Sequence, residues 1–216
     1  MMPGARIAAA IEITEEIDAR KRPAADVLKD WGRSHRFAGV KDRAAIASLV
    51  YDGLRKRASS AFIMGEETPR AIVLGALRQM HNTSAAELAA LCLGEAYAPP
   101  RLTDDEIERL SAADLTQAPD NVAGDFPAWL EPSLTAVFGP ALVAEMRALA
   151  ARAPVDLRVN TLKASRDKAL AGLKHLGAVP TPISPIGLRL PVSTGEGGPK
   201  LAAEAAYVKG IVEIQD

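Results

Sequence analysis

The chain has 216 residues, in which 26 lysines and arginines nearly balance 27 aspartates and glutamates, giving a formal net charge of −1. This balance excludes a uniformly basic nucleic-acid binder, and a hydrophobic content of 48% excludes an intrinsically disordered chain. A single cysteine, Cys92, excludes both a disulfide framework and a CxxC-type metal site.

The charges are nevertheless segregated along the chain. Residues 1–60 carry 12 basic and 8 acidic residues, residues 61–150 carry 5 and 13, and residues 151–216 carry 9 and 6. Two mildly basic ends therefore flank an acidic middle. This asymmetry is compatible with nucleic-acid contacts at the ends, although solvated charged faces would produce it as well.

The first part of the chain predicts a set of packed helices. Apolar residues at helical spacing indicate helices over residues 4–20 and 41–57. Further helix starts are marked by prolines at a first helical position and by two capping boxes, namely Pro23, Pro69, Ser84–Glu87 and Thr103–Glu106. We therefore expect an all-α domain over residues 1–118.

A connecting region is expected over residues 119–155. Proline, glycine, aspartate and asparagine crowd residues 111–127, which favours an inter-domain linker that lets the flanking domains move. Segments 128–137 and 141–151 are then predicted to be helical.

The pattern changes period after Pro154. Residues 156–160 alternate as in a short strand, and a helix over residues 165–176 is stopped by Gly177. Additional strands are predicted at 178–183, 187–190 and 211–215, with a flexible loop at 193–200. A β-α-β-β unit with one more strand predicts a small α+β domain over residues 156–216.

The sequence shows no complete catalytic site. Cys92 lies in a run of leucines and alanines, which favours an inert core thiol. His35, His81 and His175 are isolated from one another, so no metal site is expected. The glycines of residues 195–198 do not join a strand to a helix, as a phosphate-binding loop would require.

Export and membrane signals are also not expected. The apolar run that follows Arg6 is too short for the core of a signal peptide, and no run approaches the ~20 residues of a membrane span. We therefore expect a cytoplasmic protein with no membrane partner.

Basic residues near helix ends favour RNA binding. In a bundle of short helices such ends can converge on one pole, where lysines and arginines contact phosphates. The candidate RNA-binding residues are Arg33, Arg36, Lys41, Arg43, Arg55 and Arg57. A solvated basic face accounts for them slightly better than RNA contact does. Aromatic residues make up only 4% of the chain, which does not favour a platform for base stacking.

Two further candidates lie in the predicted strand at residues 156–160. Arg158 and Asn160 share one face of a strand that is otherwise apolar. On an open groove they would contact RNA, whereas in a buried position they would brace loops by hydrogen bonds.

The sequence around this strand resembles a known family. Leu157–Lys163 reads Leu-Arg-Val-Asn-Thr-Leu-Lys, preceded by Phe126–Leu130, Phe138-Gly139 and Pro154, and Gly210–Asp216 resembles the family's next signature. These motifs resemble the Sun/Fmu-like (RsmB/NOP) family of ribosomal RNA cytosine-5 methyltransferases. Residues 42–57 resemble the central helix of the NusB-like RNA-binding domain with which bacterial members begin.

The resemblance implies an all-α NusB-like domain, then a small α+β domain, then a Rossmann-like domain that binds S-adenosylmethionine. That catalytic domain would begin near Gln215, so we expect it and its two catalytic cysteines to be absent from this chain. The full-length protein would methylate small-subunit ribosomal RNA through a covalent cysteine adduct. This chain would position the RNA as a monomer, with no cofactor, no metal and no activity of its own.

Two other classes of function remain open at this point. The chain could be a stand-alone RNA-binding or antitermination adaptor, as NusB-like domains can be. It could also be a protein-interaction module whose basic helix ends meet an acidic partner.

Overall fold

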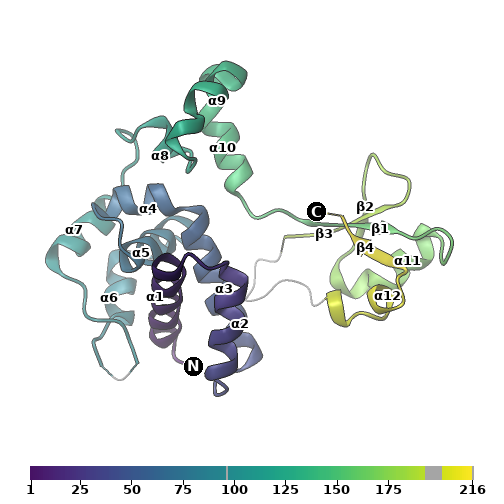
Figure 1. Ribbon diagram of the computed structural model, residues 1–216, viewed down its shortest axis with the longest axis horizontal. Coiled ribbons are helices and arrows are strands. Elements are labelled where there is room, and N and C mark those ends of the chain that lie inside the picture. The colour runs from purple at the N-terminus through teal and green to yellow at the C-terminus, as the bar shows by residue number, and fades with distance from the viewer. Residues whose placement is uncertain (96, 193–200, 216) are drawn as a thin grey trace. The chain divides into compact units, whose positions relative to one another are not determined.

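The computed structural model describes residues 1–95, 97–192 and 201–215, and it divides into two compact units, Met1–Ala151 and Arg152–Asp216 (Figure 1). We call them the helical unit and the sheet unit. Their coarse classes confirm the expected order of a helical region followed by a small α+β domain. The flexible loop expected at residues 193–200 lies outside the described residues.

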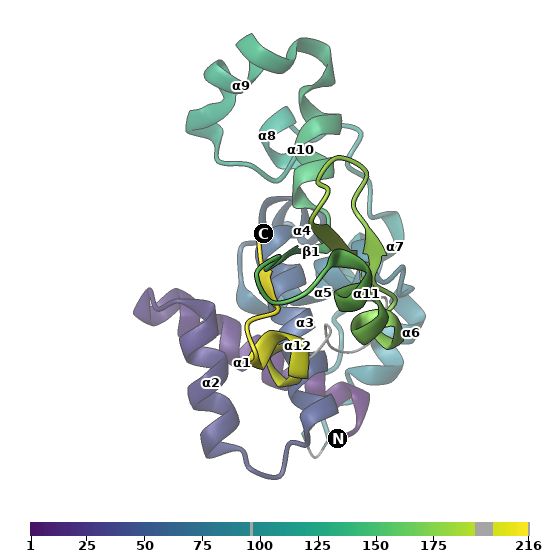
Figure 2. The same cartoon turned by 90° about the vertical axis from the view of Figure 1, so that its right-hand side faces the viewer.

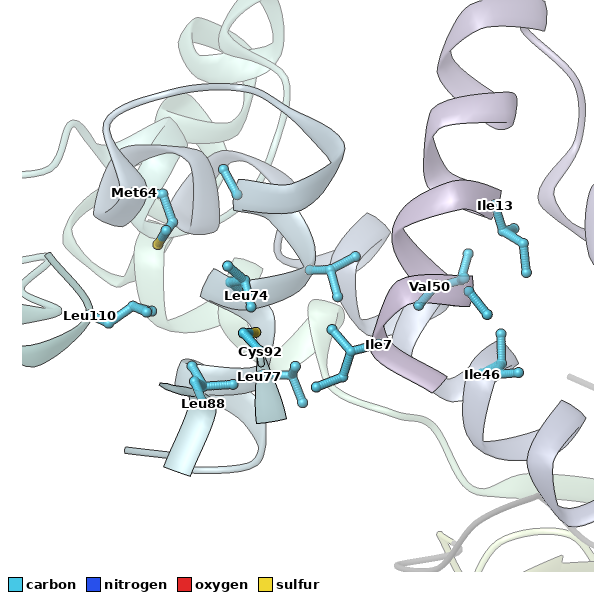
Figure 3. Packing of buried hydrophobic residues seen from close by; sticks show 14 of the residues in the cluster. Ile7, Ile13, Ile46, Val50, Met64, Leu74, Leu77, Leu88, Cys92 and Leu110 are labelled. Atoms are coloured by element: carbon cyan, nitrogen blue, oxygen red, sulfur yellow. The ribbon is translucent and has the colours of Figure 1, made fainter. Parts of the chain in front are cut away.

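The helical unit is built around a central buried helix. Its first helices are α1 (Pro3–Arg20), α2 (Ala24–Ser34), α3 (Val40–Arg55), α4 (Arg57–Met64), α5 (Pro69–Met80), α6 (Ala85–Leu91) and α7 (Asp104–Ala112). Residues 71–77 of α5 are all buried, and α5 packs against α1, α3 and α4. Side chains of the surrounding helices pack around α5 in one apolar core, which includes Ile7, Val50, Leu74, Leu88 and Leu110 (Figure 3).

Local signals set the helix starts as expected. Thr68 accepts a hydrogen bond from Ala71 N at 3.1 Å ahead of Pro69, and Ser84 and Thr103 each form a capping box with the glutamate three residues on. These side chains satisfy N–H groups that have no partner within the helix. The helix expected from Pro23 begins one residue later, at Ala24.

The helix expected over residues 41–57 is broken. α3 ends at Arg55, and α4 begins at Arg57 after the chain changes direction at Lys56. The missing side chain of Gly75 on α5 allows α4 to pack tightly, because a Cβ there would lie only 2.6 Å from Ser60 Cβ. The sequence pattern did not predict α4 as a separate helix.

The region expected to be a linker is anchored to the helical unit. It contains α8 (Asp120–Ala123), and the buried Asp125 that follows accepts hydrogen bonds from Ser59 N at 2.8 Å and Ser59 Oγ at 2.7 Å. Lys56 Nζ lies 3.3 Å from the same carboxylate. This segment is thus held on α4 by a buried charged side chain.

A helical hairpin follows, made of η1 (Ala128–Leu130), α9 (Glu131–Phe138), η2 (Gly139–Ala141) and α10 (Leu142–Ala150). Ala128–Ala150 is the one helical segment among the described residues that is long and apolar enough to cross a membrane, judged by length and composition alone. It is not one straight helix, because Gly139 adopts a positive φ of 50° between α9 and α10. The two helices share an apolar cluster around Phe126, Leu142 and Met146.

The sheet unit contains four antiparallel strands in the order β2-β3-β1-β4. Along the chain it consists of β1 (Val155–Val159), α11 (Arg166–Leu173), η3 (Lys174–Leu176), β2 (Val179–Pro180), β3 (Gly187–Leu190), η4 (Leu201–Ala203), α12 (Ala205–Val208) and β4 (Val212–Ile214). The predicted strands and the stop at Gly177 are confirmed: β3 has the expected bounds, β1 is shifted by one residue, and β2 and β4 are shorter than expected. The sequence pattern did not predict α12.

With α12 included, the sheet unit is a β-α-β-β-α-β arrangement of the ferredoxin-like type. Alternation along β1 and β3 explains how it folds: Leu157, Leu188 and Leu190 are buried against α11, while Arg158 and Arg189 face outward.

Candidate RNA-binding surface

Three of the predicted RNA-binding residues lie within nine consecutive residues, which run from the end of α2 through the connecting loop to the start of α3. Arg33 closes α2, Arg36 lies in the connecting loop and Lys41 belongs to the first turn of α3. All three are exposed, and no hydrogen bond or ion pair of the Arg36 or Lys41 side chain occurs among the described residues. Within the part of the chain that the structure describes, Arg33 has one ionic partner, Asp30, at 3.4 Å. We call Arg33, Arg36 and Lys41 the α2–α3 cation cluster.

The acidic residue nearest to the start of α3 is already compensated. Asp42 accepts hydrogen bonds from the Met1 amine at 3.0 Å and from Arg6 Nε at 2.9 Å. These contacts, the Met1 amine first, hold the pKa of the Asp42 carboxyl below its ordinary value. Asp42 therefore remains charged but is paired with other cations, and it leaves the α2–α3 cation cluster available to an anion.

Arg43, the fourth candidate in this region, stabilises the loop between α2 and α3. Its Nε donates to the carbonyl of Ala38 at 2.8 Å, and its side chain lies over Gly32. The guanidinium thus holds the loop that presents the cation cluster against the end of α2.

Arg55 and Arg57 lie at the opposite end of α3. Helices α1, α2 and α3 lie side by side (Figure 2), with Met1 near Asp42 at one end and Arg57 near Asp18 at the other. The 16 residues of α3 separate the two ends by about 24 Å. The expectation that the basic helix ends converge on one pole is therefore wrong, because successive helices of the bundle alternate in direction.

The arginines of this second end are engaged by carboxylates. Arg57 binds Asp18 through two bonds of 2.9 Å and Glu67 at 2.9 Å, and the hydrogen bonds to Asp18 raise the pKa of its guanidinium. Arg55 donates to the buried Asp52 at 2.7 Å. Arg57 thus joins α4 to α1, whereas Arg55 is paired within α3, and both guanidinium groups have less charge to offer to phosphates.

The two candidates on the sheet unit also have partners. Arg158 forms an ion pair of 2.5 Å with Glu213, its neighbour across β1 and β4. Asn160 Oδ1 accepts a hydrogen bond from Leu162 N at 3.1 Å, and its backbone N–H donates to Ile211 O at 2.8 Å. These contacts favour the bracing role for Asn160, whereas Arg158 remains on the exposed face.

The other residues considered for chemistry occupy structural positions. Cys92 is buried in the helical core, where desolvation raises the pKa of its thiol. His81 Nε2 lies 3.0 Å from Asp52 Oδ2, and His175 Nε2 lies 3.2 Å from Glu204 Oε1. Among the described residues, no group of three potential ligands could hold a metal ion.

An aromatic group lies beside the α2–α3 cation cluster, which the low aromatic content of the chain did not predict. The rings of Trp31 and His35 are stacked with centroids 4.2 Å apart, and Phe37 meets His35 edge to face at 5.7 Å. The signal that would have found it is the alternation of aromatic and basic residues in Trp31–Phe37, which reads Trp-Gly-Arg-Ser-His-Arg-Phe.

Comparison with family models finds a match over about a third of the chain. Residues 126–194 match the model described as Methyltr_RsmF/B-like, ferredoxin-like domain. This match confirms the expected resemblance to the N-terminal part of RsmB/NOP-family ribosomal RNA methyltransferases. It covers the α9–α10 hairpin and the sheet unit as far as β3.

Comparison with solved structures identifies a similar fold. The structure titled "Crystal Structure of PH0851" superimposes with a TM-score of 0.60 at 17% sequence identity, over 100% of this chain and 53% of that chain. The chain thus spans about half the length of the solved protein that it matches. No curated protein sequence matches the chain.

Proposed function

We propose that this chain is the RNA-binding N-terminal region of an S-adenosylmethionine-dependent ribosomal RNA (cytosine-5-)-methyltransferase. Its task is to hold small-subunit ribosomal RNA in place for a catalytic domain. The observation that carries the proposal is the match of residues 126–194 to the ferredoxin-like domain of RsmF/B-like methyltransferases. Methyl transfer then belongs to the full-length protein, and binding and placement of RNA belong to this chain.

The helical unit supplies the cations for that task. In the NusB-like interpretation, the α2–α3 cation cluster contacts RNA phosphates, because its three side chains are exposed and little compensated by acids. Phosphate contacts of this kind position a protein on its nucleic acid without reading the bases. Arg43 and Arg57 then act indirectly, because Arg43 holds the loop that presents the cluster and Arg57 joins α4 to α1, while Arg55 is paired within α3.

The described residues do not fit S-adenosylmethionine itself. Nucleotide cofactors of this size bind at the carboxyl ends of parallel strands, on glycine-rich loops that let the backbone approach closely. Every strand pair described in the sheet unit is antiparallel, and the β1–α11 connection over residues 160–165 contains no glycine. We therefore assign no cofactor contact to this part of the protein.

RNA binding and its salt dependence test the proposal. The probe is a fluorescein-labelled single strand from small-subunit ribosomal RNA, and the variant combines Arg33→Ala, Arg36→Ala and Lys41→Ala. Each phosphate neutralised on a single strand contributes about −0.7 to the slope of log K against log salt concentration. Because the triple variant lacks three cations, its slope should be less negative by up to about 2. Affinity at low salt should fall in parallel.

A second triple variant controls for net charge. Arg20→Ala, Lys168→Ala and Lys174→Ala remove the same charge from exposed positions outside the cluster. This control should bind almost as the unchanged protein does. Equal affinity and slope in both triple variants would contradict the placement of the RNA surface, and salt-independent weak binding would favour a protein-interaction module instead.

A further inference from the structure

A groove of about 730 Å³ opens next to the α2–α3 cation cluster, within the helical unit. The first turns of α1 form its floor, the end of α2 and its following loop form one wall, and the segment after α6 forms the other. Its lining is mainly apolar and includes Met2, Ala5, Trp31, Phe37, Leu93 and Tyr97. The volume lies within the ~300–1,000 Å³ typical of small-ligand sites.

Aromatic rings gather in this groove far beyond their share of the chain. Three of the nine aromatic residues line it, although aromatic residues make up 4% of the sequence. Phe37 is 72% exposed and Tyr97 is 81% exposed, so both walls present a ring to solvent. Trp31 and His35 lie stacked behind Phe37 and give it a rigid support. Exposed aromatic rings on such a support mark an interaction surface, on which a planar ring of a ligand can stack.

The charges around the groove are unevenly compensated. The two glutamates that line it, Glu12 and Glu95, are exposed, and each lies beside a donor, the Trp31 indole at 3.4 Å and the Arg101 guanidinium at 3.8 Å. At the edge of the groove, Arg33 and Arg36 alternate in sequence with the groove residues His35 and Phe37. Phosphate is attracted to these cations, whereas the mainly apolar lining suits uncharged rings. A ligand that fits has flat, uncharged rings on a negatively charged chain, which describes a single-stranded nucleic acid.

We infer that an unpaired nucleobase of single-stranded RNA enters this groove and stacks on Phe37 and Tyr97, while its flanking phosphates lie on the α2–α3 cation cluster. This inference rests on the proposed RNA-binding function and deepens it by naming the form of RNA. Bases in a duplex are already stacked and paired, so a continuous double helix cannot fill the site.

The experiment compares two strands that differ only in their bases. A fluorescein-labelled oligoadenylate and an abasic ribose-phosphate strand of equal length are titrated against the whole chain. Phe37→Ala and Tyr97→Ala should each weaken oligoadenylate binding by about fivefold to a hundredfold, as expected for loss of base stacking. Binding of the abasic strand should be weak and the same for all variants.

Matched variants separate base stacking from a general apolar contact. Trp129→Ala removes a 77% exposed aromatic ring outside the groove and should change neither affinity. Phe37→Leu keeps the apolar surface but removes the flat ring, and it should behave as Phe37→Ala does. Because Phe37 and Tyr97 are exposed, circular dichroism should show an unchanged fold in each variant.

A spectroscopic readout reports on the groove directly. The chain has two tryptophans, so Trp129→Phe leaves Trp31 as the single emitter. Addition of oligoadenylate should quench Trp31 emission, and the abasic strand should not.

The outcomes distinguish this inference from the proposed function. Salt-dependent RNA binding that Phe37→Ala and Tyr97→Ala leave unchanged would overturn the stacking groove and preserve the proposed function. Full binding by Phe37→Leu would overturn it too, since the groove would then require only apolar surface. If neither strand binds at all, the proposed function fails and the groove inference fails with it.

Discussion

The strands of the sheet unit and the α2–α3 cation cluster of the helical unit differ in how their basic side chains are paired. In the sheet unit, Arg158 lies opposite Glu213 and Arg189 lies opposite Asp156, each pair joining neighbouring strands. In the helical unit, the α2–α3 cation cluster lies at the end of one helix, on a loop and in the first turn of the next. Strand register brings charged side chains face to face, whereas an irregular loop imposes no such pairing.

This difference bears on how charge predicts binding. Residues 151–216 have an excess of three basic residues, as 9 basic residues face 6 acidic ones. Yet the arginines of β1 and β3 are tied to carboxylates across the sheet. Residues 1–60 have a similar excess, with 12 basic and 8 acidic residues, and the cluster belongs to them. Net charge alone therefore does not locate an anion-binding surface, because pairing decides which cations remain available.

The largest expected effect concerns a buried charge in the helical unit. The side chain of Asp125 is 2% exposed, and its carboxylate holds the segment after α8 against Ser59 and Lys56. Asp125→Ala should lower the free energy of unfolding by about 3–5 kcal/mol, because it leaves Lys56 and the Ser59 amide without their partner. Urea denaturation followed by circular dichroism measures it. Asp125→Asn retains an acceptor oxygen and should cost clearly less; equal costs would mean that the charge itself fixes the segment.

A matched pair of core truncations tests whether the units fold independently. Leu74 in the helical unit and Leu188 in the sheet unit are both fully buried, and Leu→Ala at such sites costs about 2–5 kcal/mol. A domain as small as the sheet unit has little stability to lose. Leu188→Ala should therefore unfold the sheet unit and leave the helical unit folded, while Leu74→Ala should weaken only the helical unit. Amide hydrogen exchange resolved by residue would detect it, and simultaneous loss of protection in both units would contradict independence.

The same contrast explains how much of the fold the sequence predicted. Helix starts depend on neighbouring residues, so Thr68 and the capping boxes at Ser84 and Thr103 were predicted correctly from local pattern. The break at Lys56 was missed because no proline or glycine marks it in the sequence, and the contact beside it, between Ser59 and Asp125, joins residues 66 positions apart. Helix α12 was missed because it has only four residues, too few to show a period.

The candidate site was predictable in part for a similar reason. Exposed cations within residues 33–41 are visible as a local cluster in the sequence. The pairing of Arg57 with Asp18 and Glu67 could not be predicted from spacing, since Asp18 lies on α1 and Glu67 in the loop between α4 and α5. The groove was also beyond sequence reasoning, because Tyr97 joins Phe37 only in the folded chain.

Helix caps offer a smaller comparison between the units. Thr103 accepts from Glu106 N at 3.2 Å in a box whose Glu106 also binds Arg70, whereas Ser165 makes a single bond of 3.3 Å to Lys168 N. Thr103→Ala should cost about 1 kcal/mol of stability, and Ser165→Ala should cost less. Thermal unfolding of both variants measures the difference, with Thr103→Ser as the control that keeps the cap. A larger loss for Ser165→Ala would show that the sheet unit depends more on its cap than its contacts suggest.

The smallest expected effect is the acid sensitivity of a cross-strand pair in the sheet unit. Arg189 donates two hydrogen bonds of 2.6 Å to Asp156, and these bonds lower the pKa of the Asp156 carboxyl below its ordinary value of 3.8. A carboxyl whose pKa is lower in the folded state stabilises the fold fully above that ordinary value and loses its contribution as the pH falls below it. The effect is limited because both side chains are partly exposed to solvent.

Asp156→Asn should therefore lower the stability of the sheet unit slightly at neutral pH and make it less dependent on pH between 3.8 and the lowered value. Arg189→Gln should have a similar effect, and the double variant should add little to either single change, because one interaction is removed in each case. Acid unfolding followed by hydrogen exchange in β1 and β3 separates this from changes in the helical unit. Additive losses would mean that the two side chains stabilise their strands separately, and then the cross-strand pair would not account for how the sheet unit uses its arginines.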